Sequence, residues 1–338
     1  MSRRVRRRQR QQPRTLQVFL AVVLVLLTVC VLVKAFFLKA PEQKAAELPA
    51  QPAASDTDDS QQSREEQAAQ EALRSHLERK GGFYTILLSG LDDDNGGSDT
   101  NILVAVDTVN GYVYGVSIPR DSKAIIDGKA RKINYAYNKG GTKLLADTIS
   151  EQLGIPVDYT VSVDLTGFEA LVEAIGGVNF DVPIDMDYDD PIQNLSIHFK
   201  KGVQYLNGAD AMRVVRFRHN NDGTGYGSED LGRMQTQQKF LKAVAKKMLT
   251  ASNILTKTDD YAKIFNQYVD TDLSVGNLVW LGTEVLKMGV DKIDFSTLPN
   301  EWRSPYIYLI PDETLTLVNT YLNPYVEDRT AEDLHLPS

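Results

Sequence analysis

Three short β-rich segments decide the fold of this chain: FYTILLS at residues 83–89, NILVAVD at 101–107 and YVYGVSI at 112–118. Each is rich in β-branched and aromatic residues, and turn-forming pairs lie between them, Asn95-Gly96 and Asn110-Gly111. Strands joined by such tight turns must be antiparallel. We therefore expect these segments to be neighbouring strands of one central sheet.

Helical and β-rich segments alternate after the third strand. Helical spacing or composition predicts helices at 141–153, 165–175, 230–249, 254–268 and 275–288. Further strands are predicted at 157–163 and 178–182. Helices interspersed with strands in this order predict an α/β protein, a three-layer α/β/α sandwich with a central mixed sheet.

The amino-terminal region has the charge pattern of a membrane anchor. Residues 1–14 hold seven arginines and no acid, and the nineteen residues from Thr15 to Val33 are uncharged. At ~1.5 Å per residue such a helix crosses a ~30 Å hydrocarbon layer. We predict a cytoplasmic arginine-rich arm at 1–14 and one transmembrane helix at 15–37, with the rest of the chain outside the cell. The alternative is a cleaved signal peptide, whose apolar region is usually about 7–15 residues.

The segment after the anchor lacks the apolar residues needed for a core. Residues 51–70 contain no Val, Ile, Leu, Met, Phe, Tyr or Trp, so burial cannot offset the entropy of ordering them. We predict a disordered tether with a short stalk helix at 38–80, a folded domain at 81–325 and a tail at 326–338. The formal charge of −8, less +7 for residues 1–14, leaves −15 for residues 15–338, which argues against nucleic acid as a partner.

An acidic loop, GLDDDNGGSDT at residues 90–100, joins the first two predicted strands. Carboxylates at a strand end can hold Mg²⁺ beside a phosphate. A calcium loop fits less well, because counting from Asp92 puts Leu103 where a bidentate Glu is needed. A solvated hairpin rich in Asx turns explains the loop equally well.

Arginines gather in two other segments. Arg120-Asp121 ends the third strand, as either a structural ion pair or a phosphate clamp beside a metal ligand. In RVVRFRH at 213–219, a strand over 214–218 would place Arg216 and Arg218 on one face. Like charges so close repel unless an anion lies between them, and guanidinium groups suit phosphate oxygens. The alternative is a surface strand with solvated arginines. His198 and His219 fit ordinary surface positions better than a metal pair.

Taken in order, the motifs resemble those of the LytR-CpsA-Psr family of Gram-positive envelope proteins over about 84–249, and more weakly to about 325. The residues that carry the resemblance are Ile86-Leu87-Leu88-Ser89-Gly90-Leu91-Asp92, Ser98-Asp99-Thr100, Ile118-Pro119-Arg120-Asp121, Lys132-Ile133-Asn134-Tyr135-Ala136, Gly167-Phe168, Gly176-Gly177-Val178, Leu206-Asn207-Gly208-x-x-Ala211, Arg216-x-Arg218-His219 and Asp230-x-x-Arg233-x-x-x-Gln237-Gln238.

The resemblance implies an extracellular Mg²⁺-dependent phosphotransferase, tied to the cytoplasmic membrane, that moves a teichoic acid or capsule polymer from an undecaprenyl pyrophosphate carrier to a peptidoglycan hydroxyl, typically the 6-hydroxyl of N-acetylmuramic acid. It implies Asp92 and Asp99 as Mg²⁺ ligands and Asp230 as the group that accepts the hydroxyl proton. The pyrophosphate oxygens would be bound by Arg120, Arg216, Arg218, Arg233 and Gln237. A carrier with an isoprenoid tail also requires an apolar groove near the arginines.

One position departs from the family pattern: Gly97 stands where Arg commonly precedes Ser-Asp-Thr. The corresponding phosphate contact is either missing or supplied by Lys123, Lys129 or Arg131.

Two other functions would use the same predicted pyrophosphate-binding arginines. One is a non-catalytic envelope receptor or regulator for lipid-linked glycans, and the other is a lipid pyrophosphatase whose acceptor is water.

Overall fold

The computed structural model describes residues 39–44, 77–91, 97–192, 195–227, 229–248, 250 and 258–338, except the side chains of 229–231, 258–259, 261–262 and 290. The predicted arm and anchor, residues 1–37, lie outside this part of the chain. Within it, no helix has the length and apolar character needed to cross a membrane. Contacts separate a small unit, with residues 39–41 and 274–282, from a large unit of residues 42–273 and 283–338.

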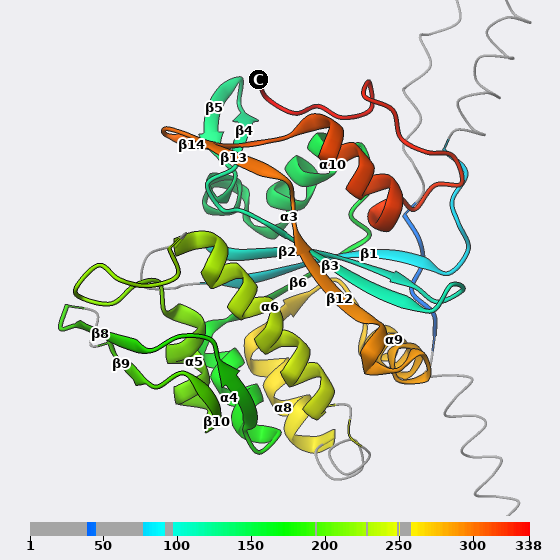
Figure 1. Ribbon diagram of the computed structural model, residues 1–338. Coiled ribbons are helices and arrows are strands. Elements are labelled where there is room, and N and C mark those ends of the chain that lie inside the picture. Colours follow the sequence, from blue (N-terminus) through cyan, green and yellow to red (C-terminus); the bar gives the residue numbers. More distant parts are fainter. Residues whose placement is uncertain are drawn as a thin grey trace, which may run out of the picture. The chain divides into compact units, whose positions relative to one another are not determined.

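A six-stranded mixed sheet forms the centre of the large unit (Figure 1). In spatial order its strands are β11 (Val269–Thr271), β6 (Tyr159–Asp164), β1 (Phe83–Leu91), β2 (Ser98–Asp107), β3 (Tyr112–Ile118) and β12 (Ile293–Thr297). The pairs β1–β2 and β2–β3 are antiparallel, as the turn signals predicted. The pairs β1–β6 and β3–β12 are parallel. The predicted α/β fold with a mixed sheet is therefore confirmed.

Helices cover both faces of this sheet (Figure 1). On one face lie α3 (Asn134–Leu153), α10 (Pro311–Leu317) and the π-helix η2 (Val318–Leu322). On the other lie α4 (Leu165–Ala174), α5 (Gly208–Arg216), α6 (Glu229–Met248) and α8 (Thr258–Tyr268). The other helices among the described residues are α9 (Val275–Met288) and the 3₁₀ turn η1 (Val290–Lys292).

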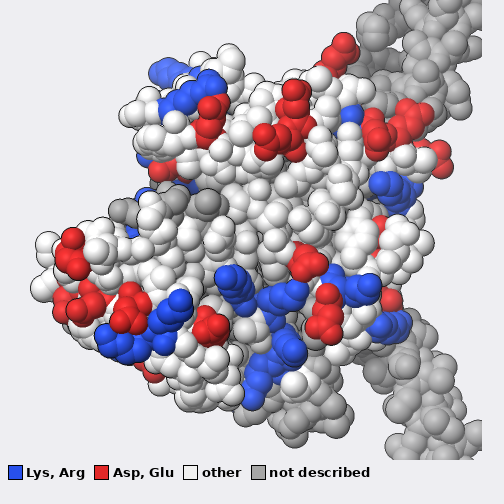
Figure 2. All heavy atoms as spheres, viewed as in Figure 1, with Lys and Arg blue, Asp and Glu red and all other residues white. Residues whose placement is uncertain are grey.

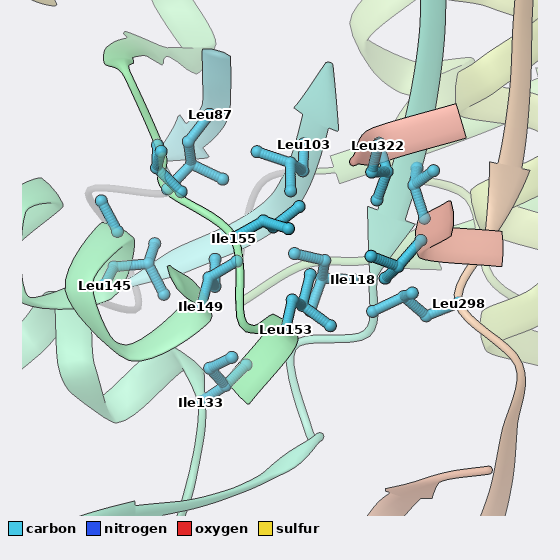
Figure 3. Packing of buried hydrophobic residues seen from close by; sticks show 14 of the residues in the cluster. Leu87, Leu103, Ile118, Ile133, Leu145, Ile149, Leu153, Ile155, Leu298 and Leu322 are labelled. Carbon is cyan, nitrogen blue, oxygen red and sulfur yellow. The ribbon is translucent and has the colours of Figure 1, made fainter. Parts of the chain in front are cut away.

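Buried residues form two separate hydrophobic clusters. The first packs the sheet against α3 and η2, and Figure 3 shows Leu145, Ile149 and Leu153 of α3 in the same cluster as Leu103 of β2. The second joins α4, α5 and α6 to the small strands β7 (Val178–Val182) and β9 (Leu195–Phe199), with Phe240 fully buried among them, and its buried residues include none of the central sheet. The α4–α6 layer therefore has a core of its own, and space remains between that core and the sheet.

Four two-stranded hairpins or ribbons surround these layers. They are β4 (Lys123–Ile126) with β5 (Lys129–Lys132), β7 (Val178–Val182) with β10 (Gly202–Leu206), β8 (Met186–Asp190) with β9 (Leu195–Phe199), and β13 (Asn300–Arg303) with β14 (Tyr306–Leu309). Only β7 was predicted. The others are only four or five residues long, so each offers few positions over which a strand pattern can be recognised.

The predicted strand over 214–218 is wrong. Residues 208–216 form α5, whose start is capped by the Asn207 side chain accepting from the Asp210 backbone N–H at 2.8 Å. The helix ends before Phe217, which is extended and buried. Ala211 and Val214 lie buried in the second cluster. Capping and burial of one helical face outweigh the β-propensity of the Val-Val pair.

Both described ends of the predicted tether contact the domain. The buried carboxylate of Asp158 accepts from the Lys44 backbone N–H at 3.0 Å and from Arg79 through two bonds of 2.7 and 2.8 Å. The Thr85 N–H of β1 donates to the same carboxylate at 2.9 Å. Residues 45–76 lie outside the described residues. One buried anion thus joins residue 44, residue 79 and the sheet.

Candidate active site

A cavity of about 850 Å³ lies between the central sheet and the α4–α6 layer. Alternation along the strands produces its floor, because Leu88 and Ile102 line it while their neighbours Leu87 and Leu103 pack into the first cluster. The remaining apolar lining comes from β6, α4, α5, α6 and β9: Val161, Val163, Leu165, Phe168, Leu171, Leu195, Met212, Val215, Leu241 and Val244. The expected apolar groove near the arginines is present.

The predicted site residues that line the cavity come from four places in the chain. Asp99 and Thr100 begin β2, Arg120 follows β3, Arg216 and Arg218 lie at the end of α5, and Arg233 and Gln237 lie on α6. Six predicted site residues are therefore brought together: Asp99, Arg120, Arg216, Arg218, Arg233 and Gln237.

The charge of this lining favours an anion. Its four arginines are opposed by two carboxylates, Asp99 and Asp164, among the described lining residues. The Asp164 carboxylate caps α4 by accepting from the Gly167 N–H at 2.5 Å. Arg233 is 93% buried, since its relative exposure is 7%. An anion near a guanidinium that is shielded from water is held more strongly than one at the surface.

Asp99 stands between two of the arginines. Arg120 donates to one carboxylate oxygen of Asp99 at 2.5 Å, and Arg218 Nη2 lies 3.9 Å from the other. All three side chains are partly exposed, so solvent and an incoming ligand can reach them. Arg120 therefore has Asp99 rather than Asp121 as its nearer carboxylate partner, since Asp121 lies 3.9 Å from the Arg120 Nε.

Arg216 and Arg218 reach the cavity by a different route from the predicted strand. Arg216 is the last residue of α5, and the extended Phe217 turns the chain so that Arg218 also lines the cavity. Gln237 supports this turn, because its side-chain NH₂ donates to the Val215 carbonyl at 3.1 Å. The two arginines thus share one cavity although they do not share the face of a strand.

The neighbouring Gln238 forms hydrogen bonds to two strands of the central sheet. Its buried side-chain amide donates to the Ser117 hydroxyl and the Ser296 carbonyl, both at 2.8 Å. These bonds tie α6 to β3 and β12. These bonds therefore also fix the position of Arg233 and Gln237, on the same helix, relative to the sheet.

Several other predicted residues are not placed at the cavity. Asp92 lies outside the described residues, and Asp230 is in the first turn of α6 with its side chain outside them. The proposed substitutes for the missing family arginine, Lys123, Lys129 and Arg131, lie on the β4–β5 hairpin and are not among the residues that line the cavity.

Residues not predicted from the sequence also line the cavity. Asn134 and Asn138 come from α3, and Tyr188 of β8 meets His219 edge to face at 5.5 Å between ring centroids. Asn134 lies within a motif that carried the family resemblance, which is the signal that could have identified it. Tyr188 had no local signal, because the hairpin that positions it was not predicted.

The described side chains at the cavity could hold Mg²⁺ only if a bound phosphate supplied some of its oxygen ligands. Within the described residues, no group of three or more His, Cys, Asp or Glu side chains could hold a metal ion. Asp99 supplies one hard oxygen donor, and Mg²⁺ usually takes one or two carboxylates together with waters and substrate phosphates. The chemistry of Asp99 therefore fits a magnesium ion that is shared with a phosphate ligand.

The fold and the site together define a class of protein: an α/β domain with one cavity that is lined both by apolar side chains and by four arginines. The model of the LytR_cpsA_psr family matches residues 49–323. The chain therefore belongs to the LytR-CpsA-Psr family.

Individual relatives agree with this assignment. The chain is 35% identical over 202 residues to the polyisoprenyl-teichoic acid–peptidoglycan teichoic acid transferase TagV of Bacillus subtilis, covering 57% of this chain and 50% of TagV. It is 32% identical over 224 residues to the regulatory protein MsrR of Staphylococcus aureus, covering 64% of this chain and 65% of MsrR. The crystal structure of B. subtilis TagV matches with a TM-score of 0.60 at 30% identity, covering 71% of this chain and 96% of that structure. The chain spans about half to two thirds of the length of these curated relatives.

Proposed function

We propose that this protein transfers an anionic glycopolymer, of the teichoic acid or capsule type, from a polyprenyl pyrophosphate carrier to a peptidoglycan hydroxyl. The proposal rests on one observation: apolar side chains and four arginines line the same cavity. A polyprenyl chain matches the apolar lining, and a pyrophosphate matches the arginines. TagV, a relative with that named activity, supports the same reaction.

The reaction is a phosphoryl transfer with the acceptor hydroxyl as nucleophile. The hydroxyl oxygen bonds to the phosphorus that carries the polymer, and the bond from that phosphorus to the bridging oxygen breaks. Polyprenyl monophosphate leaves with the electron pair, and the hydroxyl proton passes to a carboxylate, for which we propose Asp230. Arg120, Arg216, Arg218, Arg233 and Gln237 would bind the phosphate oxygens and hold the donor in line.

Magnesium is the cofactor we propose, with Asp99 and Asp92 as its protein ligands. When bound, it would neutralise part of the negative charge on the pyrophosphate oxygens. Arg120 would then exchange its contact with Asp99 for a phosphate oxygen, because one carboxylate cannot serve both cations equally. We also propose the predicted topology, in which residues 15–37 anchor the chain and the domain lies outside the cell.

Turnover by the full-length chain in detergent tests the function. A synthetic polyprenyl pyrophosphate glycan, Mg²⁺ and soluble peptidoglycan fragments should yield polyprenyl monophosphate and glycan-linked peptidoglycan in equal amounts. Asp99→Ala and chelation of Mg²⁺ should each abolish transfer. Binding without release of monophosphate would indicate a receptor, release without transfer would indicate a pyrophosphatase, and either result would overturn the proposal.

The role of the cavity is tested separately with a substitution that fills it. Leu241→Trp, on the cavity wall, should block a long-chain donor while sparing one with a short isoprenoid. The matched control is Val203→Trp, at a position 74% exposed on β10, which should leave both donors unaffected. Equal losses with long and short donors would argue against a lipid in the cavity.

A further inference from the structure

Two hairpins on the α3 side of the sheet pack into one continuous surface, which we call the two-hairpin surface (residues 121–135 and 300–309). The Tyr306 hydroxyl of β14 donates to the Ala130 carbonyl of β5 at 3.2 Å. The Ile307 N–H donates to the Asp121 carbonyl at 3.0 Å, beside a β-bridge between Ser122 and Ile307. Segments almost 180 residues apart therefore form one structural unit.

Aromatic rings and cations are interleaved on this surface. The Tyr308 ring lies beneath both Lys123 and Arg303, at 4.9 and 5.2 Å from its centroid. Arg131 lies 5.3 Å from the ring centroid of Tyr135, a residue that is 39% exposed. Trp302 is 59% exposed. Large aromatic side chains exposed next to cations are characteristic of binding surfaces, because each leaves apolar area in water that a ligand can cover.

The surface is basic in an acidic protein. Residues 121–135 and 300–309 contain five Lys and Arg and three Asp and Glu, an excess of two positive charges, whereas the chain has a net charge of −8. Figure 2 shows Lys and Arg side chains over the β4–β5 hairpin at the upper left. Its partner should therefore be anionic.

The two-hairpin surface begins at the edge of the candidate active site. Asp121 lies 3.1 Å from Lys132 Nζ of β5 and 3.9 Å from Arg120 Nε. The Asn134 N–H donates to the Arg120 carbonyl at 3.2 Å, and Asn134 itself lines the cavity. Figure 1 places β4, β5, β13 and β14 on the α3 side of the sheet, whereas α4, α5 and α6 enclose the cavity on the other side. Arg120 thus lies between the two regions.

We propose that the two-hairpin surface binds the acceptor, a peptidoglycan strand, with Trp302 stacked on a sugar ring and the surrounding cations facing carboxylates of the peptide stems. This inference rests on the proposed function. In an in-line displacement, the acceptor hydroxyl approaches opposite the leaving lipid phosphate. The lipid occupies the α4–α6 side, so the acceptor must arrive from the opposite side of the pyrophosphate, where the two-hairpin surface lies.

Sedimentation with insoluble peptidoglycan stripped of teichoic acid tests the surface without requiring catalysis. The full-length double variant Trp302→Ala/Arg131→Glu should bind at least about tenfold more weakly than the unmodified chain, since loss of a stacked aromatic and reversal of one charge both act on the same ligand. Tyr205→Ala, which removes a tyrosine 62% exposed on β10, is the matched control and should bind normally. The melting temperature should be unchanged in both, because all three side chains are exposed.

Kinetics then separates this inference from the proposed function. The double variant should raise the KM for soluble peptidoglycan fragments about tenfold and leave the KM for the lipid-linked donor unchanged. Normal binding of peptidoglycan by the variant would overturn the inference, and so would a loss confined to the purified anionic donor polymer. If the unmodified chain turns over no donor but loses peptidoglycan binding on substitution, the proposed function fails while the binding surface stands.

Discussion

At the level of single residues, the site is built around a carboxylate that already has cationic partners. Asp99 is held by Arg120 and lies near Arg218, so a substrate phosphate would enter a cluster in which one carboxylate already faces two of the arginines. This arrangement keeps the guanidinium groups in place before the substrate arrives. Preorganised donors of that kind need little rearrangement during reaction.

Arg218→Lys should reduce transfer about 10²- to 10³-fold, because the lysine keeps the charge but loses the planar fork that suits a phosphate. Arg216→Lys should act similarly, and the double alanine variant should be scarcely worse than either single alanine, since residues that act as a unit are not additive. Turnover and melting temperature of each variant check this expectation.

The control for these changes is Arg213→Lys, one turn earlier on α5, whose side chain is exposed and bound to Asp210. It should leave turnover unchanged. If Arg216→Lys and Arg218→Lys are as active as the unmodified chain, or if the alanine variants mainly lower the melting temperature, the arginines are structural.

Gly97→Arg should lower transfer rather than restore the arginine that the family commonly has at this place. Gly97 has a φ of +117°, and an added Cβ would lie 2.8 Å from the Asn138 side-chain oxygen. A residue forced into such a conformation costs about 1–3 kcal/mol. Gly81→Arg, where nothing lies within 4 Å, is the control for the added charge. Activity above that of the unmodified chain would show that a missing phosphate contact had been restored.

At the level of secondary-structure elements, the wall of the cavity depends on the β8–β9 hairpin, which supplies Tyr188 and Leu195. The loop after Arg218 holds this hairpin, since Asn220 and Asn221 each accept from a β8 backbone N–H at 2.6 Å. Arg218 and Tyr188 are therefore positioned by the same set of bonds.

His198 on this hairpin should titrate above its ordinary range. Its hydrogen bond to Asp187, at 2.7 Å, is the largest cause of a raised pKa, and the nearby Asp189 raises it further. Because the folded pKa exceeds the unfolded one, the protonated ring stabilises the hairpin fully below the unfolded pKa, and this contribution disappears as the pH rises through the folded pKa.

An NMR titration of the His198 ring checks this expectation. Asp187→Asn should move the midpoint to lower pH, whereas Asp185→Asn, which removes a partner of Lys200 instead, should not. A midpoint that is insensitive to Asp187 would contradict the assigned cause.

At the level of the whole molecule, the cavity exists because two hydrophobic clusters are built separately. The sheet packs on α3 and η2, and the α4–α6 layer packs on its own strands. A single continuous core would have filled the space. The buried carboxylate of Asp158, in turn, joins Lys44 and Arg79 to the sheet.

Asp158→Asn should destabilise the protein by about 3–5 kcal/mol, because the substitution removes one partner of a buried ion pair and leaves the Arg79 charge uncompensated. Denaturant unfolding of the full-length chain measures this change in the free energy of unfolding. The exposed pair Lys143–Asp147 provides the control, and Asp147→Asn should cost no more than about 1 kcal/mol. Equal effects of the two substitutions would mean that the Asp158 network contributes little.

Much of the central fold could be read from local pattern. The bounds predicted from the sequence agree within a few residues for the three opening strands, α4, α6, β7 and α9. In each of these elements the spacing of the apolar residues indicates which face is buried. The sequence motifs also indicated several charged side chains of the candidate site, since Asp99, Arg120 and Arg233 all line the cavity.

Three features were decided only by tertiary structure. Residues 214–216 became helical because Val214 is buried in the second cluster, a contact invisible to local β-propensity. The cavity arose because that cluster does not include the sheet, and apolar residues that line a cavity have the same local pattern as residues of a filled core. The two-hairpin surface depends on contacts between segments almost 180 residues apart. A local pattern specifies which face of an element avoids water, whereas the partner of that face depends on how the whole chain packs.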